Sequence, residues 1–145
     1  MDNSLKTGQY FLSFLESNAE LMQMLGCQGT QGFQGTQQSK IFPLIAKEGT
    51  PYPLVIYTRE GITTKYTKPT YPMGGWDNTV SISYRIYSDK YDEALEIANL
   101  IRNILEGKSY KDQNIVINHV DLISCFEAFA EDAFVQTLTF STMVE

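Results

Sequence analysis

The sequence predicts an α+β domain spanning residues 1–145, with a mostly antiparallel sheet and two helices packed on one of its faces. The chain has 145 residues, of which 43% are hydrophobic and 19% are charged, a composition that suits one globular core. Between Asp77 and Gly107 an alternating strand pattern passes directly into an amphipathic helix pattern. The last third contains only strand-like runs. The expected order of elements is therefore α-β-β-β-α-β-β.

The first helix is predicted over residues 4–25, because apolar residues recur there at three- and four-residue spacing. Asn18 falls within this stripe, where an apolar residue is expected. A hydrogen bond to a neighbouring loop and a contact with another subunit both explain it, and the first is favoured. The stripe consists of Phe11, Phe14, Leu15, Leu21, Met22 and Leu25.

A glycine- and glutamine-rich segment follows, and residues 26–39 are predicted to be a flexible loop. Between Gly26 and Gln37 the sequence GCQGTQGFQGTQ repeats glycine at every third position. Four such triplets without proline are too few for a collagen-like triple helix. The spacing also differs from that of phosphate-binding glycine loops.

The β-rich part begins with a short extended piece at Ile41. The run LVIYTRE over residues 54–60 is predicted to be a central strand, and residues 62–67 are predicted to form a hairpin arm with it after Gly61. Arg59 ends the predicted strand together with Glu60 and is available for a salt bridge across a subunit boundary.

The segment KPTYPMGGW that comes next is predicted to be a loop that carries contact residues. Aromatic and methionine side chains on a proline- and glycine-rich loop are typical of binding hot spots. In the alternative interpretation the loop folds onto its own sheet and Trp76 fills a corner of the core. The candidate contact residues are Tyr66, Tyr71, Met73 and Trp76, together with Arg59.

The strand and helix between Asp77 and Gly107 have the clearest patterns in the chain. Alternate strand residues are apolar, which predicts one buried face. Ser88 or Asp89 is expected to cap the helix through a side-chain oxygen, and Gly107 is expected to end it. The predicted buried face consists of Val80, Ile82, Tyr84 and Ile86 on the strand, and Tyr91, Ala94, Ile97, Ala98, Ile101, Ile104 and Leu105 on the helix.

The last third is predicted to contain two or three strands, in the runs NIVIN, VDLISCFEAF and AFVQTLTFSTMV. The tight connection AEDA, residues 130–133, predicts that the final two strands form a hairpin. Cys125 lies in an apolar run and is expected to be a small buried hydrophobic residue. Phe134, Leu138, Phe140 and Val144 are expected to share one face of the last strand.

Charge and motif content exclude several classes of function. A net charge of −6 argues against a protein that grips nucleic acid through its phosphates. No apolar run is long enough for a membrane helix, and the N-terminus lacks the pattern of a signal peptide. The two cysteines, Cys27 and Cys125, suggest a reducing cytoplasm. His119 and Asp121 share a strand face, but no activated nucleophile accompanies them, so a structural or solvated histidine is expected. No catalytic residue, metal site or cofactor is predicted.

Three stretches resemble the tail-completion family of long-tailed phages and prophages, which was first described as a domain of unknown function. They are IFPLIAKEGTPYPLVIYTRE, DNTVSISYRIYSDKYDEALEIANLIRNILEG and FEAFAEDAFVQTLTFSTMV, and together they cover most of residues 41–144. The resemblance implies a tail terminator that forms a ring, of six subunits, on the last layer of the tail tube.

By the same resemblance, the partners are other copies of the chain, the major tail-tube protein and the head-tail connector. DNA passes through the ring without specific binding, and no membrane is involved. The protein is expected in the cytoplasm of the host bacterium during assembly and then in the tail or neck of the virion. Two alternatives stay open: a head-closure or neck connector protein of the same module, and a small ligand-binding or enzymatic α+β domain that uses the Trp76 loop and His119.

Overall fold

The computed structural model describes residues 3–26, 39–66 and 76–145, and it confirms the α+β class. Its six strands form one sheet in the order β1-β2-β3-β6-β5-β4. The β1 and β2 strands are parallel, and every other neighbouring pair is antiparallel. The strands are β1 (Ile41–Pro43), β2 (Leu54–Tyr66), β3 (Trp76–Ser88), β4 (Tyr110–Lys111), β5 (Val116–Ala130) and β6 (Ala133–Val144).

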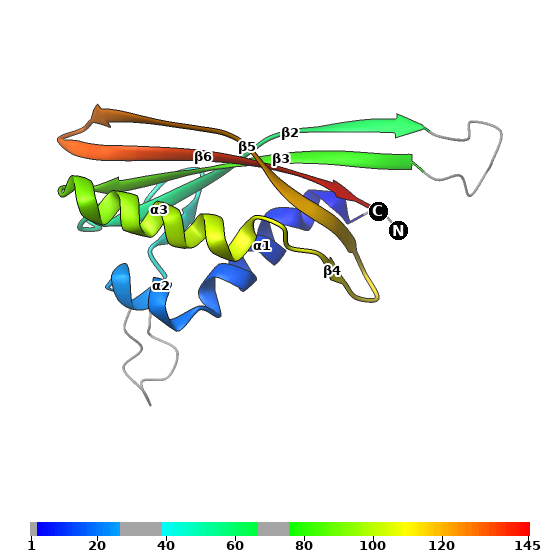
Figure 1. Ribbon diagram of the computed structural model, residues 1–145, viewed down its shortest axis with the longest axis horizontal. Coiled ribbons are helices and arrows are strands. Elements are labelled where there is room, and N and C mark those ends of the chain that lie inside the picture. The colour runs from blue at the N-terminus through cyan, green and yellow to red at the C-terminus, as the bar shows by residue number, and fades with distance from the viewer. Residues whose placement is uncertain (1–2, 27–38, 67–75) are drawn as a thin grey trace.

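The helices cover one face of this sheet and leave the other face open (Figure 1). The long helix α3 (Tyr91–Leu105) lies against β3 and β6, and the N-terminal helices pack against α3. The N-terminal part consists of the 3-10 helix η1 (Ser4–Lys6), α1 (Thr7–Glu16) and α2 (Ala19–Met24). The distal ends of β2 and β3 extend beyond the helices at one end of the sheet (Figure 1).

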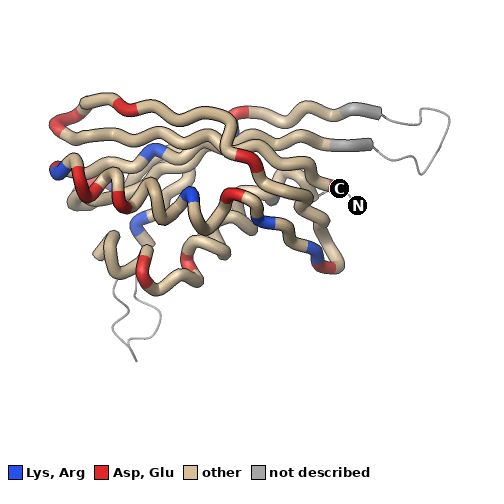
Figure 2. Tube along the Cα trace, viewed as in Figure 1, with Lys and Arg blue, Asp and Glu red and all other residues tan. Residues whose placement is uncertain are grey.

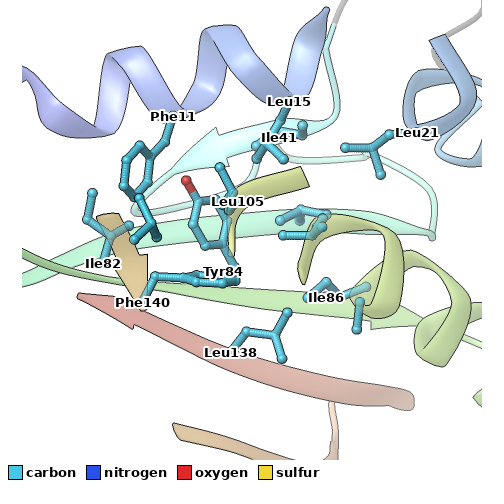
Figure 3. Packing of buried hydrophobic residues seen from close by; sticks show 14 of the residues in the cluster. Phe11, Leu15, Leu21, Ile41, Ile82, Tyr84, Ile86, Leu105, Leu138 and Phe140 are labelled. Carbon is cyan, nitrogen blue, oxygen red and sulfur yellow. The ribbon is translucent and has the colours of Figure 1, made fainter. Parts of the chain in front are cut away.

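The core lies between the helices and the covered face of the sheet (Figure 3). Tyr84 of β3 and Phe140 of β6 are fully buried at its centre, with their rings in an edge-to-face contact at 5.9 Å. The predicted face of β3, which comprises Val80, Ile82, Tyr84 and Ile86, is completely buried. The helix face is confirmed as well, except that Tyr91 at its start is 40% exposed.

The N-terminal segment is broken at Ser17 and Asn18, so the prediction of one continuous helix was wrong. The side-chain oxygen of Asn18 accepts a hydrogen bond from the backbone N–H of Leu21 at 2.9 Å. Asn18 is thus the N-cap of α2. An asparagine within the apolar stripe is explained by this local cap, because the chain has to restart a helix there.

Strand β2 is longer than predicted. The segments 54–60 and 62–67, expected to pair as a hairpin, instead form one strand that ends at Tyr66 and pairs with β3 along its length. Gly61 follows an irregularity in the register between Arg59 and Gly61, where β2 carries one residue more than β3. The glycine therefore marks a β-bulge rather than a turn. Arg59 consequently lies in the middle of β2 rather than at its end.

The junction between β3 and α3 is capped from outside the helix. Lys90 is the N-cap residue, and its side chain makes no cap hydrogen bond. The Ser88 hydroxyl accepts a hydrogen bond from the Lys90 backbone N–H at 3.0 Å and donates one to Oε1 of Glu93 at 2.7 Å. Ser88 therefore holds the first turn of α3 through the Glu93 side chain. In a capping box the serine is the N-cap residue itself, whereas Ser88 lies two residues before the N-cap Lys90. Gly107, with φ of 81°, ends the helix as predicted.

The final hairpin is confirmed. Glu131 and Asp132 form its two-residue turn, and both have positive φ angles of 55° and 58°. These values are those of the type I′ turn, which matches the twist of paired strands. The runs NIVIN and VDLISCFEAF form the single strand β5, in agreement with the expected order that has two long strands after the second helix. The register of β5 is irregular before Val120 and before Ser124.

Candidate interaction surface

Most of β5 has an unpaired outer edge. Strand β4 pairs only with Val116 and Ile117. Beyond them, Val120 exchanges hydrogen bonds with the turn after α3, donating to the carbonyl of Lys108 at 3.0 Å and accepting from the N–H of Gly107 at 2.7 Å. From Asp121 to Ala130, no described residue pairs with this side of the strand. We call this segment the β5 edge.

The β5 edge carries large apolar side chains on the surface. Ile123, Phe126 and Phe129 are 57%, 59% and 62% exposed. Proteins usually protect exposed edge strands with lysine, proline or short length, and the β5 edge has none of these features. A long apolar edge of this kind indicates a surface that another polypeptide covers.

Cys125 belongs to this edge and is exposed, so the prediction that it is buried was wrong. The run LISCFEAFA looks like a buried strand because it is apolar on both faces. The same pattern arises on an edge strand whose two faces are covered by another polypeptide after assembly. The sequence signal for this surface was therefore present, and it was assigned to the core.

A polar network ties the distal part of β5 to the helical layer. Oε2 of Glu127 accepts a hydrogen bond from the hydroxyl of Tyr91 at 2.8 Å and one from Nε2 of Gln136 at 2.9 Å. The Gln136 bond, followed by the Tyr91 bond, lowers the pKa of the Glu127 carboxyl. The hydrogen bond to Glu127 raises the pKa of the Tyr91 hydroxyl.

Aromatic contacts reinforce this attachment. The ring of Phe134 contacts Tyr91 at 5.6 Å and Phe129 at 5.2 Å, both in edge-to-face geometry. Such pairs add about 0.5–1.5 kcal/mol each beyond the burial of their area. The hairpin is thus held on α3 even though its outer edge lacks a neighbour.

The open face of the sheet contains a hollow of about 540 Å³ between β2, β3, β6 and β5. Arg85 of β3 and Glu60 of β2 supply its charges, and Phe126, Ala128 and Ala130 of β5 form its apolar side. Apolar and polar groups are therefore mixed on this part of the face. The hydroxyl-bearing lining residues are Thr58, Ser83, Tyr87, Thr137 and Thr139.

Charge is distributed unevenly along the chain. Residues 112–145 contain six acidic residues and no lysine or arginine, whereas residues 1–111 contain eleven of each kind. The whole net charge of −6 therefore resides in the segment that forms β5 and β6. Figure 2 shows acidic positions along this hairpin and basic positions elsewhere.

The predicted contact residues do not gather into one described site. The Arg59 guanidinium donates a hydrogen bond to the backbone carbonyl of Leu5 at 3.2 Å. The backbones of Tyr66 and Trp76 pair where β2 ends and β3 begins. Their side chains lie outside the described part of the structure. Tyr71 and Met73 lie outside the described residues altogether, so the contact role of all five residues stays a prediction.

His119 lies on the surface of β5. Its Nε2 is 3.1 Å from Oδ1 of Asp121, and both side chains are about two-thirds exposed. This arrangement agrees with the expected solvated histidine. Among the described residues, no group of three histidine, cysteine or acidic side chains is placed to hold a metal ion. The helices within the same ranges are too short or too polar to cross a membrane.

Comparison with known proteins gives a structural match. No family model matches the sequence, and no curated protein matches it. The fold is similar to that of a solved chain described as "Virion of native gene transfer agent (GTA) particle". The two chains share 13% sequence identity with a TM-score of 0.67, and the match covers 93% of this chain and 91% of that chain. At this identity the likeness shows a shared fold.

Proposed function

We propose that this protein is a structural component of a phage-like virion. The observation that carries the proposal is the match over nearly the full length of both chains to a chain from a gene transfer agent virion. The sequence resemblance to tail-completion proteins points in the same direction. A structural role also fits the surface, because the described residues expose an apolar strand edge, which suits assembly rather than turnover of a substrate.

Within such a particle, the proposed role is that of a tail terminator. Subunits would form a ring of six on the end of the tail tube, stop its growth and present a surface to the head-tail connector. No reaction is proposed, and DNA would cross the ring without specific binding. The acidic C-terminal segment supports the last point, since the six carboxylates of residues 112–145 have no basic residue among them and would repel phosphates.

The test uses polymerisation of the cognate major tail-tube protein with and without an excess of this protein. The expected result is short tubes with a ring density at one end, measured as a length distribution by electron microscopy. Tubes of uncontrolled length despite the excess would contradict the terminator role.

The same fold likeness is compatible with a head-closure or neck connector subunit, because the matched description names the virion and not the part. Binding to purified portal rings, with no binding to tail tubes, would favour that role. The two outcomes are separated by sedimenting the protein with tubes and with portals in parallel.

A further inference from the structure

We propose that the β5 edge of one subunit pairs antiparallel with the outer edge of β2 in a second copy of the chain, so that the sheet continues from subunit to subunit. The inference rests on the proposed ring and names the contact that would build it. Its basis is the geometry and charge of two strand edges on opposite sides of the same sheet.

The second edge belongs to β2. Strand β1 pairs with Val55, Ile56 and Tyr57, and the Leu44 N–H bonds the Tyr57 carbonyl. From Thr58 to Thr64, no described residue pairs with the outer side of β2, and we call this segment the β2 edge. At about 3.3 Å per residue it spans roughly 23 Å, and the β5 edge spans roughly 33 Å. The two unpaired edges are thus long enough to match.

Strand direction favours the pairing. Each of the steps β2 to β3, β3 to β6 and β6 to β5 is antiparallel, so β2 and β5 run in opposite directions within one subunit. If the next subunit is related by rotation about an axis close to the strand direction, its β2 therefore lies antiparallel to β5 of the first. Antiparallel ladders have hydrogen bonds perpendicular to the strands and are slightly more stable per residue than parallel ones.

Charge disfavours pairing of one β5 edge with another β5 edge. The β5 edge carries Asp121 and Glu127 and ends at the acidic turn of Glu131 and Asp132. The β2 edge carries Arg59 and Glu60, so its charges cancel and it does not repel an acidic strand. A second β5 edge would place acid against acid, so pairing of β5 with β5 is disfavoured and pairing with β2 is favoured.

Pairing would also cover the apolar side chains of the β5 edge. Phe126 lies on the open face of β5 and Phe129 on the helical face, and both are exposed, so side chains of a neighbouring strand could pack against them on either face. The two edges are different surfaces, so the contact is heterologous, the kind of contact from which a ring is built when its rotation closes. Copies of this chain alone would therefore be enough to form the proposed interface.

Cysteine cross-linking in the full chain tests the pairing. The exposed Cys125 serves as the β5 probe after Cys27→Ser removes the other thiol. Cys125 is opposite Leu138 and so faces the helical side of the sheet, as do Arg59, Ile62 and Thr64 of β2. Thr58 and Thr63 face the open side and serve as matched controls.

Single substitutions of these five β2 residues by cysteine are oxidised in concentrated protein and at tube ends. At least one of the three helix-side positions should give a ladder of covalent multimers on a non-reducing gel, and Cys125→Ser should abolish it. The two open-side positions should give at least tenfold less covalent multimer than the helix-side positions. No ladder from any helix-side position in either sample, or equal ladders from both sets, would overturn the pairing.

Phe126→Lys provides an independent readout, since a charge at the centre of the β5 edge should raise the dissociation constant for self-association at least tenfold. Met143→Lys is the control, because Met143 is a partly exposed residue of β6, which is paired on both sides. Circular dichroism checks that both variants fold. An equal effect of the two variants would contradict the role of the edge. Cross-linking without tube capping would refute the terminator role alone, and capping without cross-linking would refute the pairing alone.

Discussion

The Tyr91 hydroxyl at the start of α3 donates a hydrogen bond to Oε2 of Glu127 on β5 at 2.8 Å, across 36 residues of sequence. The bond joins the helical layer to the part of the hairpin that lacks an outer neighbour. Because Gln136 donates to the same oxygen, the Glu127 carboxylate is held by one group from a helix and one from a strand.

Glu127→Gln should make the melting temperature less sensitive to acid. The folded-state pKa of Glu127 is lowered by its hydrogen bonds to Gln136 and Tyr91, so its contribution to stability is complete above its ordinary pKa of about 4.3 and is lost as the pH falls through the lowered value. The wild type should therefore lose stability more steeply than the variant below about pH 4.3. Thermal denaturation from pH 3 to pH 7 measures this, with Glu96→Gln on the exposed side of α3 as the control. Parallel curves for wild type and Glu127→Gln would refute the role of the carboxylate.

Tyr84→Phe should stabilise the fold. The Tyr84 hydroxyl is buried without a hydrogen-bond partner among the described residues, and this burial raises its pKa well above the ordinary range. Removing an unsatisfied buried hydroxyl should raise the free energy of unfolding by about 1 kcal/mol. Tyr84→Ala, which empties the same space, should lower it by about 3–5 kcal/mol. Chemical denaturation measures both, and a loss of stability in Tyr84→Phe would show that the hydroxyl has a partner.

Asn18→Ala should lower the free energy of unfolding by about 1 kcal/mol, because the N–H of Leu21 loses its side-chain acceptor. Asn18→Asp keeps an acceptor oxygen at the same position and should stay within a few tenths of a kcal/mol of the wild type. Equal losses in both variants, measured by urea denaturation, would mean that Asn18 acts through some contact other than the cap.

Gly107→Ala should destabilise by about 1 kcal/mol, since φ of 81° places the residue in the left-handed region. Space is not the cause, because an added Cβ would lie 3.8 Å from the nearest atom of His119. Gly61→Ala is the matched control: Gly61 has an ordinary φ and nothing within 4 Å of an added Cβ. Denaturation midpoints that move equally in the two variants would contradict a conformational origin.

The parts of the fold with strong periodicity could be predicted from the sequence, and these are β3, α3 and the final hairpin. On β3, and on the predicted helix face from Ala94 onward, the apolar residues of the periodic stripe are buried or half-buried. Two errors arose where one local signal has two meanings. Gly61 is compatible with a turn or a bulge, and Asn18 is compatible with an interruption or a cap; the choice depends on strands and helices that lie elsewhere in the chain.

The interaction surface was harder to predict for a different reason. A strand that is apolar on both faces looks the same whether its own chain or another chain covers it. Cys125 and Phe126 follow the rule for a buried strand, and only the position of β5 beside β6, with little beyond it, shows that they are exposed. The uneven charge was visible in the sequence, but its meaning depends on β5 and β6 being neighbours.

The position of β6 has a consequence for biosynthesis. Of the six strands, β6 leaves the ribosome last, yet it lies between β3 and β5 and joins them into one sheet. Until it emerges, β3 has one vacant side, and β5 can pair only near its start, with the two residues of β4 and with the turn at Gly107 and Lys108. The nascent chain therefore cannot complete its core by folding in order from the N-terminus. The sheet can be completed only after β6 has left the ribosome. A chain whose synthesis stalls before Ala133 should therefore be bound by chaperones or degraded by proteases.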